Sequence, residues 1–131
     1  MERRDLLRAI LAAFYLAAGI VHVAWPAPFL TVMPAFMPYP YEVVIGTGIV
    51  EILGAIALYI PRLRWLAGVM LAAYAVCVYP ANIQHAWNDI AVAHDYAMLW
   101  YHVPRLPFQP VLIWAALYAG QVIDWPWRRK V

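Results

Sequence analysis

The sequence contains no serine and a single cysteine, Cys77, among its 131 residues. The lack of serine removes the commonest hydroxyl nucleophile, and the two threonines, Thr31 and Thr47, have no evident base and orienting group beside them. A lone cysteine allows neither an intramolecular disulfide nor a paired-cysteine redox motif. Hydrolase chemistry of the nucleophile type is therefore excluded, and any thiol chemistry would need a partner.

Charged side chains are scarce as well. They make up 12% of the chain, whereas hydrophobic residues make up 66%, and the mean hydropathy is +0.69. These values do not fit a soluble domain of this length, so we predict a membrane-embedded chain that forms one domain over residues 1–131. Its basic residues flank apolar segments and form no separate basic region, so nucleic acid is not an expected partner.

Four apolar segments are each close to the roughly 20 residues that a membrane-spanning helix needs. They cover residues 5–24, 42–60, 63–81 and 106–123. The first is longer than the apolar region of a signal peptide, and Trp25 follows it in place of a small-residue cleavage site. The sequence therefore predicts an all-α integral membrane four-helix bundle.

The basic residues predict the orientation of this bundle. They lie before the first segment, between the second and third, and after the fourth: Arg3, Arg4, Arg8, Arg62, Arg64, Arg128, Arg129 and Lys130. Arg105 is the exception, at the edge of the fourth segment. Because positive charge accumulates in cytoplasmic loops, we expect both termini in the cytoplasm.

Two longer connections should then face outward. Residues 25–41 carry five prolines among aromatic residues, so we expect a stiff cap at the outer interface and no regular helix. Residues 82–104 contain enough helix-forming residues to extend the third span or to form an interfacial helix.

Glu51 stands at the centre of the second segment, where an acidic residue costs about 2.5–3.5 kcal/mol on insertion scales. Helical periodicity groups it with Gly48 and Ala55, and small residues mark close contacts between membrane helices. We therefore expect Glu51 to point inward, uncharged, within reach of a tyrosine hydroxyl from Tyr15 or Tyr74. Two roles stay open for it, a proton relay and a structural hydrogen-bonding anchor.

Polar residues of the other segments also fall on faces rich in small residues. This repetition predicts an internal polar cavity that opens outward and has Glu51 on its floor. Asn82 and Gln109 could instead hold helices together, and Arg105 could anchor a helix at the interface. The candidate ligand-binding residues are His22, Tyr15, Asn82, His85, Arg105 and Gln109.

A metal site is the weaker alternative. His85 and Asp89 are one helical turn apart, and imidazole and carboxylate ligands suit zinc, copper or iron. However, the sequence has no HExxH motif and no paired ligand motif, and the outer histidines could simply face water. We predict no metal at the candidate ligands, which are His22, His85, Asp89, His94 and His102.

Four stretches occur in a characteristic order: "GIVHVAWP", "PYPYEVVIGTGIVEILGAIALYIP", "YPANIQHA" and "RLPFQ". With these spacings the chain resembles the DoxX-like family of small four-helix membrane proteins over most of residues 11–120. The resemblance implies a multi-pass protein of a prokaryotic cytoplasmic (inner) membrane. The family is named after a small subunit of a thiosulfate:quinone oxidoreductase, and other members are linked to membrane redox or stress complexes. The family positions carry over to His22, Glu51, Pro80, Asn82, Arg105, Pro107 and Gln109.

Two classes of function follow. In the first, the chain is a small subunit of a membrane redox assembly whose cavity holds a quinone or a small sulfur compound while Glu51 relays protons. Because the sequence has no haem, flavin or iron–sulfur motif, a partner protein would supply the electrons. In the second, the chain is a non-enzymatic bundle that binds or moves a small hydrophobic molecule or supports another membrane protein. The expected partners are the lipid bilayer, a redox protein and further copies of the chain.

Overall fold

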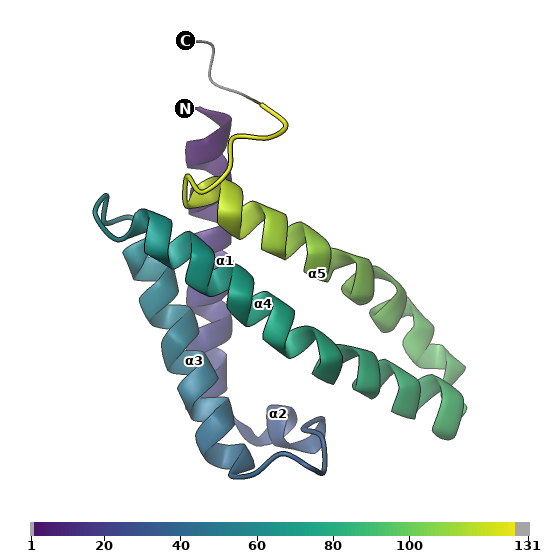
Figure 1. Cartoon of the computed structure of the whole chain (residues 1–131). Helices are drawn as coiled ribbons and strands as arrows, with labels where there is room; N and C mark the ends of the chain where they lie inside the picture. Colours follow the sequence, from purple (N-terminus) through teal and green to yellow (C-terminus); the bar gives the residue numbers. More distant parts are fainter. Residues whose placement is uncertain (1, 128–131) are drawn as a thin grey trace.

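The computed structural model describes residues 2–127, and within them all regular secondary structure is helical, with turns and irregular segments between the helices. A π-helical turn, η1, continues the fourth helix, and a 3₁₀ turn, η2, precedes the fifth (Figure 1). The all-α prediction is therefore confirmed. The elements are α1 (Arg3–Ala24), α2 (Ala27–Thr31), α3 (Pro40–Ala57), α4 (Arg64–Trp87), η1 (Asn88–Val92), η2 (Tyr96–Met98) and α5 (Leu99–Ala119).

Three of these helices are long and apolar enough to cross a membrane: α1, α3, and α4 together with η1. The fourth predicted span, residues 106–123, differs from the helix that forms there. Helix α5 begins earlier, at Leu99, and ends at Ala119, after which Gln121 adopts a left-handed conformation with φ 62°. Prolines 104, 107 and 110 lie inside α5 and supply no backbone donor, yet the helix continues through them.

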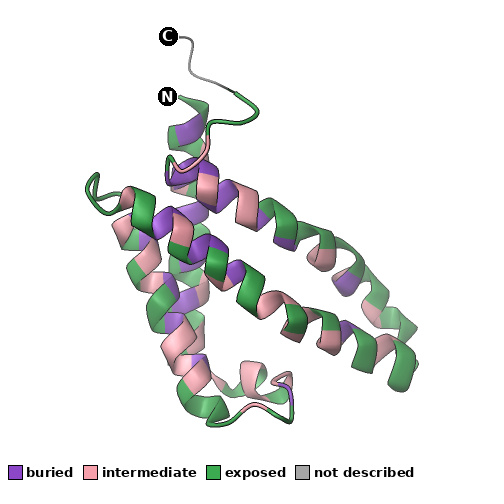
Figure 2. Ribbon diagram, viewed as in Figure 1, coloured by how far each residue is buried: buried purple, intermediate pink, exposed green. Residues whose placement is uncertain are grey.

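The helices form two pairs. Helix α1 packs mainly on α3, and α4 mainly on α5, with smaller contacts between α1 and α5 and between α3 and α4. In Figure 1 the two pairs lie together near the chain termini and diverge toward the opposite end. Buried residues concentrate where the pairs meet (Figure 2). The arrangement is thus less regular than the four-helix bundle that the sequence predicts.

Glycines let the helices approach closely. A Cβ atom added to Gly48 would lie 2.7 Å from the Cβ of His22 and 2.9 Å from the carbonyl oxygen of Gly19, so α1 and α3 meet at these residues. A Cβ atom added to Gly120 would lie 2.5 Å from the Cα atom of Gly68, so α4 and the end of α5 contact each other at these two glycines. Small residues at helix contacts, as the sequence predicts, therefore set the spacing of the fold.

The proline-rich connection contains a helix, contrary to our expectation. Pro26 occupies the N-cap position of α2 and Pro28 lies in its first turn, where a missing backbone N–H costs nothing. The Thr31 hydroxyl donates a hydrogen bond to the Pro28 carbonyl at the other end of α2. The second connection behaves as predicted, because α4 continues through Pro80 to Trp87 and then into η1.

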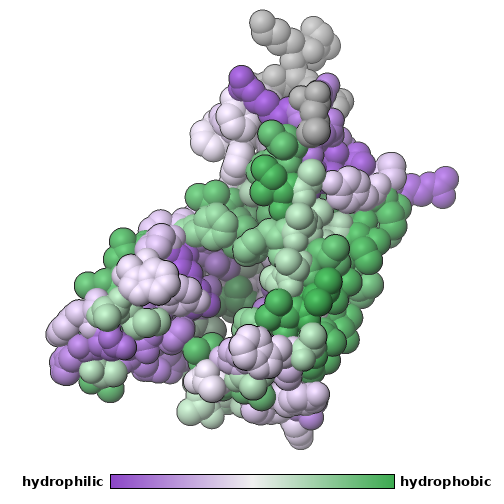
Figure 3. All heavy atoms as spheres, turned by 180° about the vertical axis from the view of Figure 1, so that it is seen from behind, coloured by the Kyte–Doolittle hydropathy of each residue, from purple (hydrophilic) through white to green (hydrophobic). Residues whose placement is uncertain are grey.

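Two arginines near the N-terminus bind residues at and just after the end of α5, and we call this set of contacts the clasp. Arg4 and Arg8, which the sequence suggests only as flanking charges, are 6% and 5% exposed. Arg4 pairs with Asp124 and donates to the Ile123 carbonyl, and Arg8 donates to the Ala119 carbonyl. Figure 3 shows hydrophilic residues gathered at this end and again at the far end of the α4–α5 pair, with hydrophobic surface between them.

Candidate functional site

The first polar cluster surrounds Glu51, whose side chain on α3 is 6% exposed. The Tyr74 hydroxyl on α4 donates a hydrogen bond of 2.7 Å to its Oε1, so the expected tyrosine contact is made by Tyr74. Nδ1 of His22 on α1 lies 3.1 Å from Oε2 of Glu51 and 2.7 Å from the Ala18 carbonyl oxygen. Tyr15 packs edge to face on Tyr74, with ring centroids 6.3 Å apart.

The contact between His22 and Glu51 corrects the sequence-based arrangement, which placed His22 nearer the outer surface. Helices α1 and α3 run antiparallel and touch at Gly19 and Gly48. Because helical side chains lean toward the N-terminus of their own helix, His22 and Glu51 lean toward each other. Glu51 is expected to be uncharged, because the sequence predicts no cation close to it. The structure brings the imidazole of His22 within 3.1 Å of its carboxyl group. The charge state of Glu51 stays a prediction.

The second polar cluster joins α4 to α5. Arg105 donates to Asn82 Oδ1 at 2.6 Å and to His85 Nδ1 at 3.1 Å. Asn82 donates to Gln109 at 3.3 Å, and Gln109 donates to the Ala75 carbonyl oxygen at 2.6 Å. Four of the predicted ligand-binding residues, Asn82, His85, Arg105 and Gln109, therefore do come together.

Asp89 and His102, which the sequence suggests only as ligands of the weaker metal alternative, complete this cluster. Oδ2 of Asp89 lies 3.2 Å from His85 Nε2 and 2.8 Å from His102 Nε2. His102 is only 2% exposed. The missed signal is helical spacing: once α5 begins at Leu99, His102 lies one turn before Arg105 on the same face.

The two clusters join different pairs of helices, and the predicted cavity with Glu51 on its floor stays a prediction. They lie on different sides of α4, where the Tyr74 side chain reaches Glu51 while the neighbouring Ala75 carbonyl accepts from Gln109. Consecutive helical residues point about 100° apart, so α4 presents one polar face to α3 and another to α5.

The second cluster also has the donor set of a metal site. The ligand atoms of His85, Asp89 and His102 all lie within 4.8 Å of one another, and two imidazoles with a carboxylate suit zinc or iron. A histidine bound to a metal normally donates its other ring N–H to an acceptor. Here His85 Nδ1 faces the guanidinium of Arg105, which only donates, and His102 Nδ1 has no partner. The geometry fits a hydrogen-bonded network better than a metal centre.

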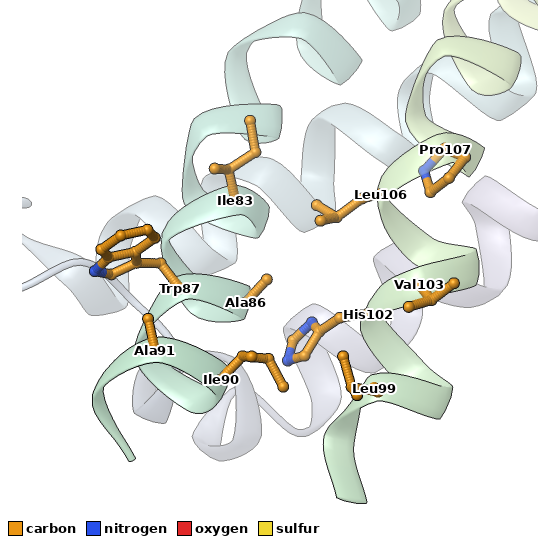
Figure 4. A pocket seen from close by; sticks show the side chains of 10 residues that line it. All are labelled: Ile83, Ala86, Trp87, Ile90, Ala91, Leu99, His102, Val103, Leu106 and Pro107. Atoms are coloured by element: carbon orange, nitrogen blue, oxygen red, sulfur yellow. The ribbon is translucent and has the colours of Figure 1, made fainter. Parts of the chain in front are cut away.

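An apolar groove of about 530 Å³ runs beside His102, between the end of α4 with η1 and the beginning of α5. Figure 4 shows ten side chains that line it, and all except His102 are apolar. Trp87 and Ala91 come from the α4 side and Leu106 from the α5 side. The groove thus offers an apolar wall with a single polar ring, which belongs to the second cluster.

Comparison with known proteins gives one family match. The model of a family described as a domain of unknown function (DUF8561) matches residues 11–119. No curated protein and no solved structure matches the chain. The resemblance to the DoxX-like family therefore stays a prediction from the sequence.

Proposed function

We propose that this chain is a multi-pass membrane protein that binds a small hydrophobic molecule in the groove between α4 and α5. The chain belongs to the DUF8561 family, whose function is unknown, so the proposal is argued from the geometry of the groove. One observation carries the proposal. The groove is apolar except at His102, and the buried His102 is hydrogen-bonded to Asp89 in the partly buried cluster that also holds His85 and Arg105. An apolar wall with one fixed polar group is typical of sites for small apolar ligands.

The charges of the cluster favour a neutral ligand. The cluster holds one guanidinium, that of Arg105, and one carboxylate, that of Asp89, linked through His85. Since these charges compensate each other, the groove offers no excess charge to an anion or a cation. Its volume lies within the roughly 300–1,000 Å³ of small-molecule sites, and its open side leaves room for an alkyl tail. A quinone or quinol has this chemistry.

The accompanying role that we propose is that of a small subunit in a membrane redox assembly. Cys77 is exposed and free, and the sequence has no motif for a haem, flavin or iron–sulfur centre, so a partner protein would exchange electrons with the ligand. The DoxX-like resemblance supports this role. Glu51 lies outside the groove, so proton exchange with the ligand would fall to His102 and not to Glu51.

The alternative is a non-enzymatic bundle that binds or moves a small molecule or supports another membrane protein. The hydrogen bonds from Gln109 to Ala75 and from Arg105 to Asn82 favour it, because they join α4 to α5 whether or not a ligand is present. The two functions differ in their ligand. Copurified quinone supports the redox role, whereas a groove filled only by membrane lipid supports the alternative.

We expect a tryptophan at Ala91 to block the groove. Ala91 is exposed and lines the groove, so Ala91→Trp fills the site without overpacking a buried position. Mass spectrometry of lipid extracts should show bound quinone in the purified wild-type protein and roughly tenfold less in Ala91→Trp, which corresponds to about 1.4 kcal/mol of binding free energy. Ala93→Trp is the matched control, because Ala93 is exposed outside the groove. Equal quinone content in all three proteins would show that the groove is not the binding site.

The finer topology is also a proposal: four spans in the cytoplasmic membrane, with both termini in the cytoplasm. The clasp between Arg4 and Asp124 supports it, because it keeps both ends of the chain on one side and therefore requires an even number of crossings. Helices α1, α3, and α4 together with η1 are long and apolar enough for three crossings, and we propose that α5 supplies the fourth.

A reporter fused after Val131 is expected to be active only in the cytoplasm, and one inserted after Phe36, between α2 and α3, only outside. Reporter activity measured in intact cells checks both positions. Activity of the C-terminal fusion outside the cell would mean that α5 does not cross the membrane.

A further inference from the structure

We infer that Nδ1 of His102 is the proton-accepting group of the groove, and that the ligand presents a hydroxyl group to it, as a phenol or a quinol does. This inference rests on the proposed binding of a hydrophobic molecule between α4 and α5. It goes further by naming the atom that meets the polar head of the ligand and the hydrogen-bonding character that the head must have.

The hydrogen-bond network fixes where the protons of the two histidines lie. A guanidinium can only donate, so Arg105 at 3.1 Å makes Nδ1 of His85 an acceptor. The proton of a neutral His85 is then on Nε2, which lies 3.2 Å from Oδ2 of Asp89. Nε2 of His102 lies 2.8 Å from the same oxygen and therefore also carries its proton. A neutral His102 consequently has a bare lone pair on Nδ1.

This lone pair has no hydrogen-bond partner among the described residues. Nδ1 of His102 is buried and makes no hydrogen bond, although the ring lines the groove (Figure 4). A buried acceptor without a donor is unfavourable, and no side chain of the groove donates to Nδ1 of His102. A ligand hydroxyl that enters between the groove walls would satisfy it. A carbonyl oxygen in the same place would bring two lone pairs together, so a quinol should bind more tightly than the corresponding quinone.

Asp89 also prepares His102 to take the proton. A carboxylate that accepts from one ring nitrogen holds the imidazole in a single tautomer and stabilises the imidazolium that forms when the other nitrogen is protonated. In this step the O–H bond of the ligand breaks and an N–H bond forms at Nδ1 of His102. The electron pair of the broken bond stays on the ligand oxygen, and no electron is transferred.

The test uses a pair of probes that differ only in the donor. Binding of para-hexylphenol and of its methyl ether, para-hexylanisole, is measured by calorimetry on the purified full-length protein. We expect the phenol to bind roughly tenfold more tightly, since the ether leaves Nδ1 unsatisfied. His102→Leu should remove the difference, whereas His94→Leu, at an exposed histidine outside the groove, should retain it.

Nitrogen NMR of ¹⁵N-histidine-labelled wild-type protein provides a second readout that does not depend on a folded variant. We expect an unprotonated Nδ1 at His102 in the free protein and a shift of its signal with the phenol but not with the ether. A protonated Nδ1 in the free protein overturns the inference. So does equal binding of the two probes; if Ala91→Trp still abolishes that binding, the groove remains the site and only the role of His102 fails. Binding that Ala91→Trp leaves unchanged would refute the proposed function itself.

Discussion

Replacing Glu51 with leucine is expected to lower the free energy of unfolding by about 1–3 kcal/mol, whereas glutamine should leave it nearly unchanged. Leucine removes the acceptor of the Tyr74 hydroxyl and leaves that buried donor without a partner. A glutamine amide can keep the hydrogen bond with Tyr74, since its side-chain oxygen can accept from the Tyr74 hydroxyl in place of the carboxylate oxygen. The hydrogen bond from Tyr74 joins α4 to α3 at Glu51, as the anchoring role requires.

Chemical denaturation in mild detergent measures both variants. The same two substitutions at Glu42, an exposed residue in the first turn of α3, serve as controls and should change the free energy of unfolding by no more than about 0.5 kcal/mol. If leucine and glutamine at Glu51 cost the same, the hydrogen bond with Tyr74 contributes nothing to stability. The anchor would then have to be sought in packing.

A methyl group at Gly48 should destabilise the protein by about 1–3 kcal/mol, although alanine is the better helix former. The new Cβ would lie 2.7 Å from the Cβ of His22 and 2.9 Å from the carbonyl oxygen of Gly19, so α1 and α3 would have to move apart. Their separation would also disturb the contact between His22 and Glu51. The histidine NMR signals of Gly48→Ala should therefore change together with its stability.

Gly46 provides the matched control, two residues away on the same helix. A Cβ at this position meets no atom within 4 Å, so Gly46→Ala gains helix propensity at no packing cost. We expect it to be neutral or stabilising by up to about 1 kcal/mol, as measured by the same denaturation experiment. Equal effects at the two glycines would contradict the close packing of α1 on α3.

Part of this architecture could be predicted from the sequence because burial in a helix follows its period. Glu51 shares a face with Val44, Gly48 and Ala55, and all four are buried. Tyr74 was one of two tyrosines expected to reach Glu51, and it does. The contact of His22 with Glu51 was missed because depth was counted from Cα positions along each helix, which ignores the lean of long side chains toward the helix N-terminus.

The groove and its polar ring were missed for a different reason. The sequence predicts that the fourth span begins at residue 106, so it places His102 in a connection and suggests it only as a metal ligand, whereas α5 begins at Leu99. The grouping of Asn82, Arg105 and Gln109 was expected, because they fall on inward faces. Their bond pattern could not be derived, since it depends on how far α4 and α5 extend beyond the compact part of the fold.

The clasp at the chain ends has a consequence for biosynthesis. Arg4 and Asp124 are 120 residues apart in the sequence, and Arg8 and Ala119 are 111 apart. A ribosome therefore delivers the two arginines long before the groups that bury them, and they must be held by water or lipid phosphates while the intervening helices are synthesised. The clasp can therefore form only after α5 has been synthesised and has packed beside α1. A chain that stops at Ala119 would leave the buried Arg4 without the carboxylate of Asp124, and thus with an unpaired charge.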